Sequence, residues 1–331
     1  MRLAALHRSS MVLALGAALF AGMGYAATPA AVESLLKARD AKALAQAQAL
    51  VDANESSAQA WTLLARAHLQ KGEADKAVDS AEQAVELAPD NAQAQLWLGN
   101  SLGVRIGQVN MLRKMAMAPD LRDAFEAAVR LDPDLLDARS ALIQFYLQAP
   151  EAMGGGIGKA KAQVAEIAKR NAARGHLAQA TIERAHNKDA EAAAKSIEAA
   201  AAAVSALPAS DIDTRVSVGL SLVAIERYAQ ARDYYQAWIA AQPRHAAPHY
   251  HLGRLAAMSG EYLEEGAAGL KRYLDGGLAR GDNDPKDTNA WWRLGQIQSK
   301  QGDAAAARAS FQTALRLDPA NEEAKKSLAA L

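Results

Sequence analysis

The stretch Thr288–Asn321, TNAWWRLGQIQSKQGDAAAARASFQTALRLDPAN, contains two helical patterns separated by a polar turn. The first pattern repeats at steps of three and four residues, as one face of an α-helix does, in Trp291, Leu294, Gly295 and Gln298. The second repeats in the same way, in Ala307, Phe311 and Ala314, before Pro319 ends it. Large side chains opposite small ones let two antiparallel helices approach closely. Because such a hairpin cannot bury its apolar face alone, the sequence predicts a copy stacked on each side.

These residues resemble the tetratricopeptide repeat family. The resemblance covers a large-Leu-Gly pattern in the first helix, an Ala-x3-Phe-x2-Ala pattern in the second and a closing proline, all within Thr288–Asn321. It implies an all-α fold, a right-handed superhelical solenoid of antiparallel helix hairpins. It also implies a concave surface, formed by the first helices, on which an extended or helical peptide binds.

Further copies follow along the chain. Ala58–Asn91 is a full copy, and Leu98-Gly99 follows Leu64-Ala65 by 34 residues, which is the period of the family. The pattern returns at Ile212 and continues to Pro319, whereas 173–205 fits it poorly. We therefore expect residues 27–331 to form about seven helix pairs plus a C-terminal capping helix, with insertions near 103–118, 149–158 and 276–287.

The first 26 residues have the pattern of a secretory signal peptide. Arg2 and Arg8 form a basic start, Met11–Met23 is a short apolar stretch, and Gly24-Tyr25-Ala26 offers a cleavage site before Ala27. The alternative is an uncleaved anchor helix. We expect export to the periplasm, or secretion beyond it, and no integral membrane span in the mature chain.

Composition limits the classes of function. The chain of 331 residues contains no cysteine, which excludes disulfides, cysteine-based zinc sites, cysteine nucleophiles and the acylated cysteine of a bacterial lipoprotein. The formal net charge is zero, whereas a domain that grips phosphates usually carries a basic excess. This balance favours a protein or peptide partner and argues against nucleic acid.

Motifs for catalysis or metal binding are weak. The glycine-rich stretch Gly154–Lys159 lacks the first glycine and the hydroxyl residue of a phosphate loop. His249 and His251 point about 200° apart on a helix and cannot easily share one ion, so we interpret them as surface or groove residues. The acidic run from Asp282 to Asp287 lacks the glycine and glutamate of a calcium loop. We expect no enzyme activity, no cofactor and no metal.

The resemblance assigns the groove to residues that lie three before, one after and about four after each Gly-like position. On the clear repeats these are Thr62, Arg66, Leu69, Leu96, Asn100, Gly103, Ser140, Gln144, Val216, Leu220, Tyr250, Arg254, Ala257, Trp292, Gln296 and Ser299. The side chains best suited to hold a peptide by hydrogen bonds, ion pairs or apolar contact are Arg66, Asn100, Gln144, Tyr250, Arg254, Trp292 and Gln296. The family's complete Lys/Asn/Arg set for a chaperone C-terminus is not found.

The insertion Gly103–Ala118 is the second candidate surface. It contains Arg105, Arg113 and Lys114 and no acidic residue, with methionines at helical spacing. A mobile cationic flap of this kind binds an acidic peptide or touches an anionic membrane; the alternative is a lid packed over neighbouring repeats.

Two hypotheses of function follow from this sequence. The first is a non-catalytic scaffold of the periplasm or cell envelope that binds a partner in its concave groove. The second is a structural subunit of an envelope complex that uses the convex face or the insertion. A metal-dependent enzyme is the remote third.

Overall fold

The computed structural model describes residues 27–281 and 284–331, and helices form most of this part of the chain. The first helices of successive pairs are α1 (Pro29–Lys37), α3 (Ala58–Lys71), α5 (Ala92–Gln108), α7 (Leu136–Gln148), α9 (Ala172–Ile182), α11 (Ile212–Ala224), α13 (Ala246–Ser259) and α15 (Asp287–Lys300). Their partners are α2 (Ala43–Ala53), α4 (Ala74–Leu87), α6 (Met111–Leu131), α8 (Ile157–Arg170), α10 (Ala190–Ala203), α12 (Tyr228–Ala241), α14 (Leu263–Leu274) and α16 (Ala304–Leu317). The last helix is α17 (Glu322–Ala329).

The described residues therefore form eight pairs and a final helix, one pair more than the sequence predicts. The difference arises between Pro150 and Ser210, where three helices, α8, α9 and α10, replace the uncertain pattern. Here α9 and α10 pack closely through alanines, with Ala180 and Ala193 almost fully buried. Two helices lined with alanine can approach without a bulky residue between them, so the family pattern is absent although the hairpin forms.

Polar caps and glycines set the helix boundaries. The side chains of Ser57, Asn91 and Asp303 each accept a hydrogen bond from a backbone N–H in the first turn of the helix that follows. Gly72 and Gly260 end α3 and α13 in the left-handed region, at φ of +77° and +80°. These local signals make each helix stop where its hairpin must turn.

Within the pairs, a glycine on the first helix meets a large side chain on the second. This relation holds between Gly99 and Phe125, Gly219 and Tyr235, Gly253 and Leu270, and Gly295 and Phe311. The missing Cβ makes room for the ring or branched chain and lets the helices pack closely. This contact confirms the all-α hairpin architecture expected from Thr288–Asn321.

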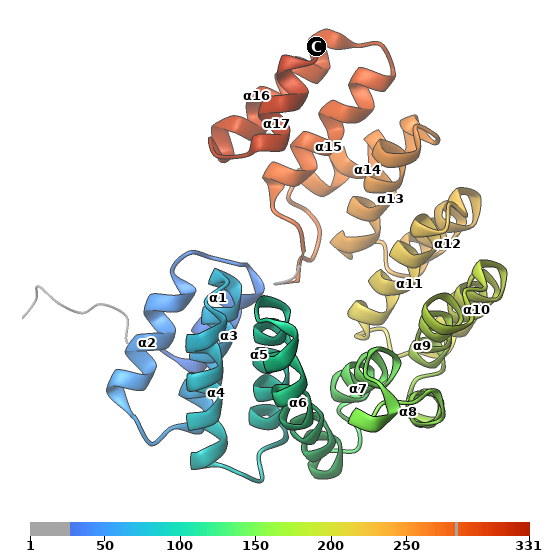
Figure 1. Cartoon of the computed structure of the whole chain (residues 1–331). Coiled ribbons are helices and arrows are strands. Elements are labelled where there is room, and N and C mark those ends of the chain that lie inside the picture. The colour runs from blue at the N-terminus through green and yellow to red at the C-terminus, as the bar shows by residue number, and fades with distance from the viewer. Residues whose placement is uncertain (1–26, 282–283) are drawn as a thin grey trace, which may run out of the picture.

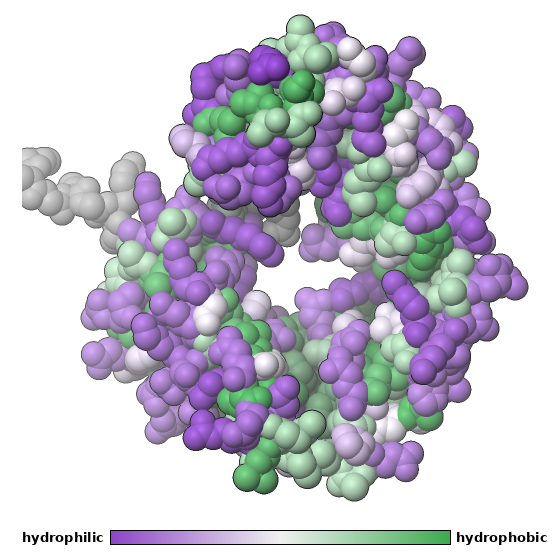
Figure 2. Space-filling view, turned by 45° about the horizontal axis from the view of Figure 1, so that its top comes forward, coloured by the Kyte–Doolittle hydropathy of each residue, from purple (hydrophilic) through white to green (hydrophobic). Residues whose placement is uncertain are grey.

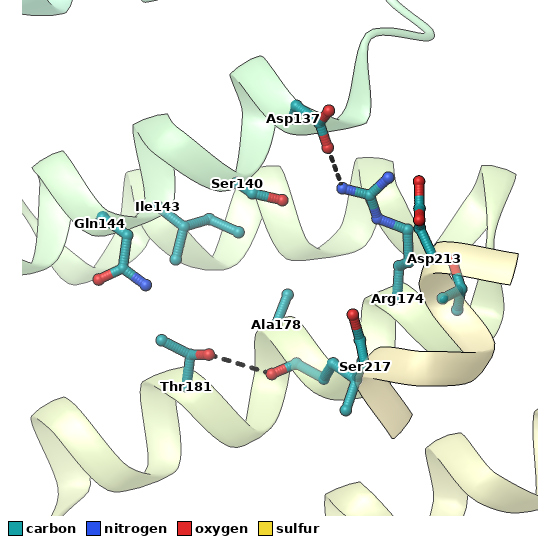
Figure 3. A pocket seen from close by; sticks show the side chains of 11 residues that line it. Asp137, Ser140, Ile143, Gln144, Arg174, Ala178, Thr181, Asp213 and Ser217 are labelled. Carbon is teal, nitrogen blue, oxygen red and sulfur yellow. Dashed lines mark hydrogen bonds and ion pairs between the residues drawn. The ribbon is translucent and has the colours of Figure 1, made fainter. Parts of the chain in front are cut away.

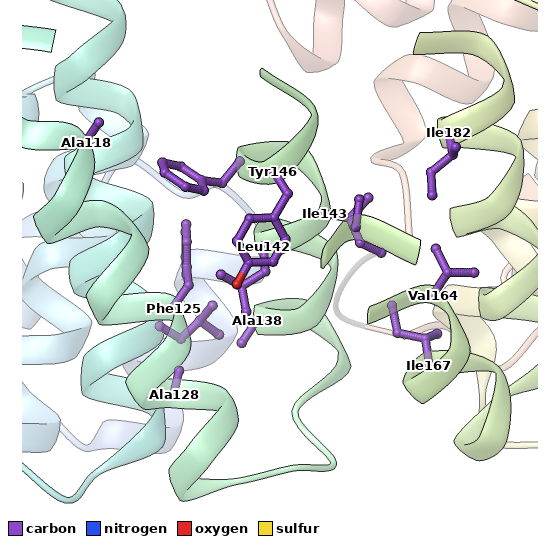
Figure 4. Packing of buried hydrophobic residues seen from close by; sticks show 13 residues of the cluster. Ala118, Phe125, Ala128, Ala138, Leu142, Ile143, Tyr146, Val164, Ile167 and Ile182 are labelled. Atoms are coloured by element: carbon purple, nitrogen blue, oxygen red, sulfur yellow. The ribbon is translucent and has the colours of Figure 1, made fainter. Parts of the chain in front are cut away.

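The pairs follow a curve that encloses a central opening, with the odd-numbered helices on its inner side (Figures 1 and 2). In the described part of the chain, buried apolar residues form five clusters along this curve rather than one core, and two of these share partly buried residues. The largest cluster joins α5 to α9, and Figure 4 shows α7 at its centre, with Phe125 on one side and Val164 on the other. Each pair is thus stabilised by its neighbours, as in a solenoid.

The three predicted insertions differ in structure. Residues 103–118 are not a separate flap, because they extend α5 at its end and α6 at its start; α5 has 17 residues and α6 has 21. Residues 149–158 form a short 3-10 turn, Glu151–Met153, and the start of α8. In 276–287, Ala279 forms a β-bridge with His245 that holds the loop against the start of α13.

No helix in 27–281 or 284–331 has the length and hydropathy needed to cross a bilayer. The expected signal peptide, Met1–Ala26, lies outside the described residues, as does Asp282 of the acidic run.

Candidate functional site

The middle of the inner surface contains a pocket of about 320 Å³ between α7, α9 and α11. Its lining is mostly polar and comprises Asp137, Ser140, Ile143, Gln144, Arg174, Leu177, Ala178, Thr181, Asp213, Thr214 and Ser217. Figure 3 shows Gln144 and Ser140 from α7 facing Ala178 and Thr181 from α9, with Ser217 of α11 beside them. Three consecutive first helices therefore form one concave polar surface.

An ion pair bridges one end of this pocket. Arg174 of α9 pairs with Asp137 of α7, while Asp213 of α11 has no ion-pair partner among the described residues. The lining therefore contains one more carboxylate than guanidinium groups. Together with the hydroxyls of Ser140 and Ser217, this arrangement offers hydrogen-bond acceptors to an incoming backbone or amine.

Positive charge predominates further along the inner surface, on α13 and α15, which pack side by side. Arg254 of α13 and Arg293 of α15 each bury their Nε without a hydrogen-bond partner in the described chain. Neither forms an ion pair with a described carboxylate. Burial is the main cause that lowers the pKa of Arg293; the charge of Arg254 also lowers it, while Tyr250 and Glu323 act in the opposite direction. Two half-buried guanidinium groups on neighbouring helices thus lack a carboxylate partner among the described residues.

Neighbouring side chains hold Arg293 in place. Its guanidinium lies 4.2 Å from the centre of the Trp292 ring, and its Nη1 donates a hydrogen bond of 3.0 Å to Gln296 Oε1. Trp292 in turn donates its Nε1–H to Ser327 Oγ of α17 at 3.0 Å. A guanidinium stacked on an aromatic ring keeps its edge free for a planar anion such as a carboxylate.

Several predicted groove residues are at least partly exposed on the first helices of their pairs. Gln144 is exposed and lines the central pocket. Asn100 is half-buried on α5, and its side chain forms no hydrogen bond with the described residues. Arg254, Trp292 and Gln296 are half-buried and lie on α13 and α15. The structure therefore brings Arg254, Trp292 and Gln296 to adjacent helices, with Arg293 among them.

Two predicted groove residues have other roles. Tyr250 is 5% exposed and packs in the core with Tyr273, their ring centres 5.3 Å apart, so it is not an open apolar anchor. Arg66 forms an ion pair with Glu33 of α1 and stacks on Trp97 at 4.7 Å. Neighbouring helices cover both side chains, which a pattern along one helix does not reveal.

The interpretation of the histidines as surface or groove residues is wrong. His249 is 8% and His251 6% exposed, and His251 stacks on Tyr235 with ring centres 5.9 Å apart. In the part of the chain that the structure describes, no three His, Asp or Glu side chains gather as metal ligands would.

The basic residues of 103–118 differ in availability. Arg105 pairs with Asp75 of α4. Arg113 is exposed and Lys114 half-buried at the start of α6, and neither forms an ion pair with a described residue. These two cations stand beside the exposed methionines of the same helix.

Sequence reasoning missed Arg174, Thr181, Asp213, Ser217 and Arg293. Ile143 and Gly219 occupy Gly-like positions, and Asp137 and Asp213 lie six residues before them. The predicted lining began three residues before each Gly-like position, so the pocket extends one helical turn further toward the N-terminus on the same helix face. That offset was a usable signal. Arg174 and Thr181 lie on α9, whose pattern is too irregular to fix the register.

Comparison with known proteins places tetratricopeptide repeat models on three segments, residues 30–92, 219–279 and 288–321. A search of curated proteins found no match. Among solved structures, the chain is similar to TTC0263 of Thermus thermophilus, described as a thermophilic tetratricopeptide repeat protein. The identity is 17% and the TM-score 0.46, over 59% of this chain and 95% of that one.

Two other solved structures are similar over more of the chain. A tetratricopeptide repeat protein of Parabacteroides merdae is 14% identical, with a TM-score of 0.39 over 83% of this chain and 98% of its own. PilF of Pseudomonas aeruginosa is 13% identical, with a TM-score of 0.40 over 84% and 99% respectively.

Proposed function

We propose that this chain, which is a tetratricopeptide repeat protein, acts as a non-catalytic scaffold that binds a peptide segment or partner protein on its concave surface in the periplasm. Binding of protein or peptide partners is the general role of such repeats. The finer assignment, to the inner surface and to an acidic segment, rests on the side chains described above.

One observation carries the proposal: Arg254 and Arg293 lie on neighbouring first helices with buried, unpartnered Nε atoms and no ion pair to a described carboxylate. The Nε atoms are covered, whereas these half-buried guanidinium groups keep Nη donors that a carboxylate can reach, and a hydrogen bond to a charged group contributes about 1.5–3 kcal/mol. A carboxylate accepts two parallel hydrogen bonds from one guanidinium. An aspartate, a glutamate or a C-terminal carboxylate of the partner therefore fits this position best.

The central pocket supplies the second contact. Gln144, Ser140 and Asp213 present donors and acceptors along α7 and α11, as a peptide backbone requires. Because these side chains stand on packed helices, little conformational entropy is lost when a segment binds. A segment that crosses α7 to α15 would place its polar backbone on the pocket and its acidic end on Arg254 and Arg293.

The proposed location rests on the sequence of Met1–Ala26, with its basic start and short apolar stretch. Export and cleavage before Ala27 would release the helices of 27–331 as a free scaffold. The partner would then be another protein of the cell envelope.

Photocrosslinking in the native host tests this function. A photoreactive residue in place of Gln296 lies beside Arg293, whereas one in place of Arg308 lies on the exposed face of α16. We expect the Gln296 position to capture a discrete envelope protein through an acidic segment, and the Arg308 position to capture none. Equal capture from both positions, or capture through a segment without acidic residues, would contradict the proposal.

A further inference from the structure

The row of first helices is interrupted between α5 and α7. Whereas α3 packs against α5, and α13 against α15, α5 and α7 scarcely touch. Part of α6, the second helix between them, is exposed through the gap. The interruption coincides with the elongated hairpin, because α6 has 21 residues and α7 only 13. The first turns of α6 therefore extend past the helices that would otherwise cover them.

The gap is a groove of about 630 Å³. Its lining is predominantly apolar and comprises Gly103, Ile106, Met111, Lys114, Met115, Ala118, Leu121, Phe125, Ala141, Gln144, Phe145, Gln148, Ala149, Pro150 and Met153. Phe125 and Phe145 belong to the buried cluster, so the groove opens directly onto the core of the α5–α9 region.

Apolar exposure in the described chain concentrates here. Four of the eight exposed large apolar side chains lie within twelve residues, Val104, Met111, Leu112 and Met115. Met111 is 71% and Leu112 79% exposed. Isolated exposed apolar residues are normal, but a cluster around an apolar groove marks an interaction surface. Methionine side chains adapt to the shape of a partner.

Among the described residues that line the groove, only Lys114 is charged. Lys114 lines the groove and Arg113 is its exposed neighbour, and neither forms an ion pair among the described residues. No acidic residue occurs in 103–118. Gln144 and Gln148 of α7 stand on the opposite side, where their amides can donate hydrogen bonds.

We propose that this groove, formed by α5, α6 and α7, binds an amphipathic helix of another protein, with an apolar face and acidic flanks. The partner helix would pack on the exposed first turns of α6. It would fill the gap that remains because α5 and α7 scarcely touch. The uncovered turns, Met111–Ala118, are about 12 Å long at 1.5 Å per residue, which suits anchors at i, i+3, i+4 and i+7 of a partner helix. Acidic flanks would face Arg113 and Lys114.

This surface is separate from the Arg254 and Arg293 region, because its lining comes from α5, α6, α7 and the turn that follows α7. It shares Gln144 with the central pocket, so its occupant is tested independently of the proposed function through variants on α6, whose residues do not line that pocket. The test uses two labelled peptides of about 18 residues, long enough for five helical turns. Both carry the same leucine face, one with glutamate flanks and the other with lysine flanks, and their affinities for the purified protein are measured by fluorescence anisotropy.

We expect the glutamate peptide to bind at least about tenfold more tightly than the lysine peptide. The double variant Met111→Gln/Met115→Gln should weaken its binding by about tenfold or more. The variant Arg113→Glu/Lys114→Glu should reverse the preference between the two peptides. All four side chains lie on the surface of α6, so circular dichroism should show unchanged helix content.

Matched controls replace exposed apolar residues elsewhere, Met258→Gln and Leu317→Gln, and should leave affinity unchanged. Both peptides are also measured on the Arg254→Gln/Arg293→Gln variant, which lacks the acidic-segment site of the proposed function. The preference for the glutamate peptide should persist there, which separates failure here from failure of the proposed function. Equal affinity for both peptides, or no loss in the methionine variant, overturns the proposal. Binding to phosphatidylglycerol vesicles without binding to the glutamate peptide assigns the patch to a membrane surface instead and likewise overturns it.

Discussion

Gly295 of α15 lies directly against the ring of Phe311 of α16: a Cβ added to Gly295 would come within 2.6 Å of the Cε1 atom of Phe311. Phe311 is 2% exposed and cannot move aside without disturbing its neighbours. The same relation joins Gly99 to Phe125, so close packing of each hairpin depends on a missing methyl group.

The variant Gly295→Ala should therefore destabilise the C-terminal repeats by about 1–3 kcal/mol, the usual cost of overpacking a core. The measurement is the midpoint of urea unfolding. Gly107 supplies the control, because it lies near the end of α5 and nothing is within 4 Å of a Cβ added there. Gly107→Ala should be neutral or slightly stabilising, since alanine favours helix. Equal changes in the unfolding midpoint at the two positions would show that helix propensity, and not packing against Phe311, determines the effect of the substitution.

Protonation of His251 should link stability to pH. Burial, and then the charge of Arg254, lower the pKa of His251 to about 3 in the folded protein, whereas an unfolded histidine titrates near about 6.5. Below pH about 6.5 the unfolded chain binds a proton that the folded chain does not. The free energy of unfolding is therefore highest above pH about 6.5 and decreases as the pH is lowered toward about 3. At pH 5 the decrease is about 2 kcal/mol.

The variant His251→Phe keeps a ring against Tyr235 and removes the titrating group. Its unfolding midpoint should change less between pH 7 and pH 5 than that of the unaltered protein. Met258→Phe, at an exposed position of α13, controls for the added phenylalanine and should leave the pH dependence as it was. If His251→Phe retains the full loss between pH 7 and pH 5, other groups account for it.

The pair Arg254→Gln/Arg293→Gln should weaken binding of the partner captured at Gln296 by at least about tenfold, because a hydrogen bond to a charged group contributes about 1.5–3 kcal/mol. Binding should also lose sensitivity to salt. Isothermal titration at two salt concentrations measures both effects. Arg308→Gln, on the exposed face of α16, is the matched control. We choose Arg293 rather than Trp292 because Trp292 also contacts Ser327 of α17, so its removal would disturb the cap.

Truncation after Asn321 should uncover the end of the solenoid. It removes Ala324, which is fully buried, and Ser327, the hydrogen-bond partner of Trp292. A loss on the order of 2 kcal/mol is expected from the apolar area exposed, seen as an earlier first transition in thermal unfolding and as association in sedimentation. Lys325→Ala/Lys326→Ala, on the solvated face of α17, should show neither change.

Expression in a Gram-negative host should yield a mature chain that begins at Ala27, as intact-mass analysis of the periplasmic fraction would show. The pattern of Met1–Ala26 predicts cleavage after Ala26. Recovery of the full-length chain from the membrane fraction would support the uncleaved anchor instead.

The repeat pattern predicted much of the fold because it is local. Trp291, Leu294 and Gly295 recur with the helical period, and Pro319 ends the second helix, so a hairpin follows from about 30 neighbouring residues. The pair α9 and α10 could not be predicted from the repeat pattern, because alanines pack closely without leaving a distinctive pattern in the sequence. Because the pattern fixes no register in this segment, Arg174 and Thr181 were also absent from the predicted site.

The sequence by itself determined that this protein is a row of helix pairs, since period, caps and small-to-large contacts act within one hairpin and its neighbours. Tertiary structure decided which side chains of the inner helices remain available to a ligand. Tyr250 occupies a position that the pattern assigns to the groove, yet Tyr273 and α15 bury it, while Arg293, one residue after Trp292, remains without an ion pair to a described carboxylate. The reason is physical: a helical period fixes the face on which a side chain lies, but coverage of that face depends on the distance to the next repeat. The gap between α5 and α7 arises in the same way and is invisible in any single hairpin.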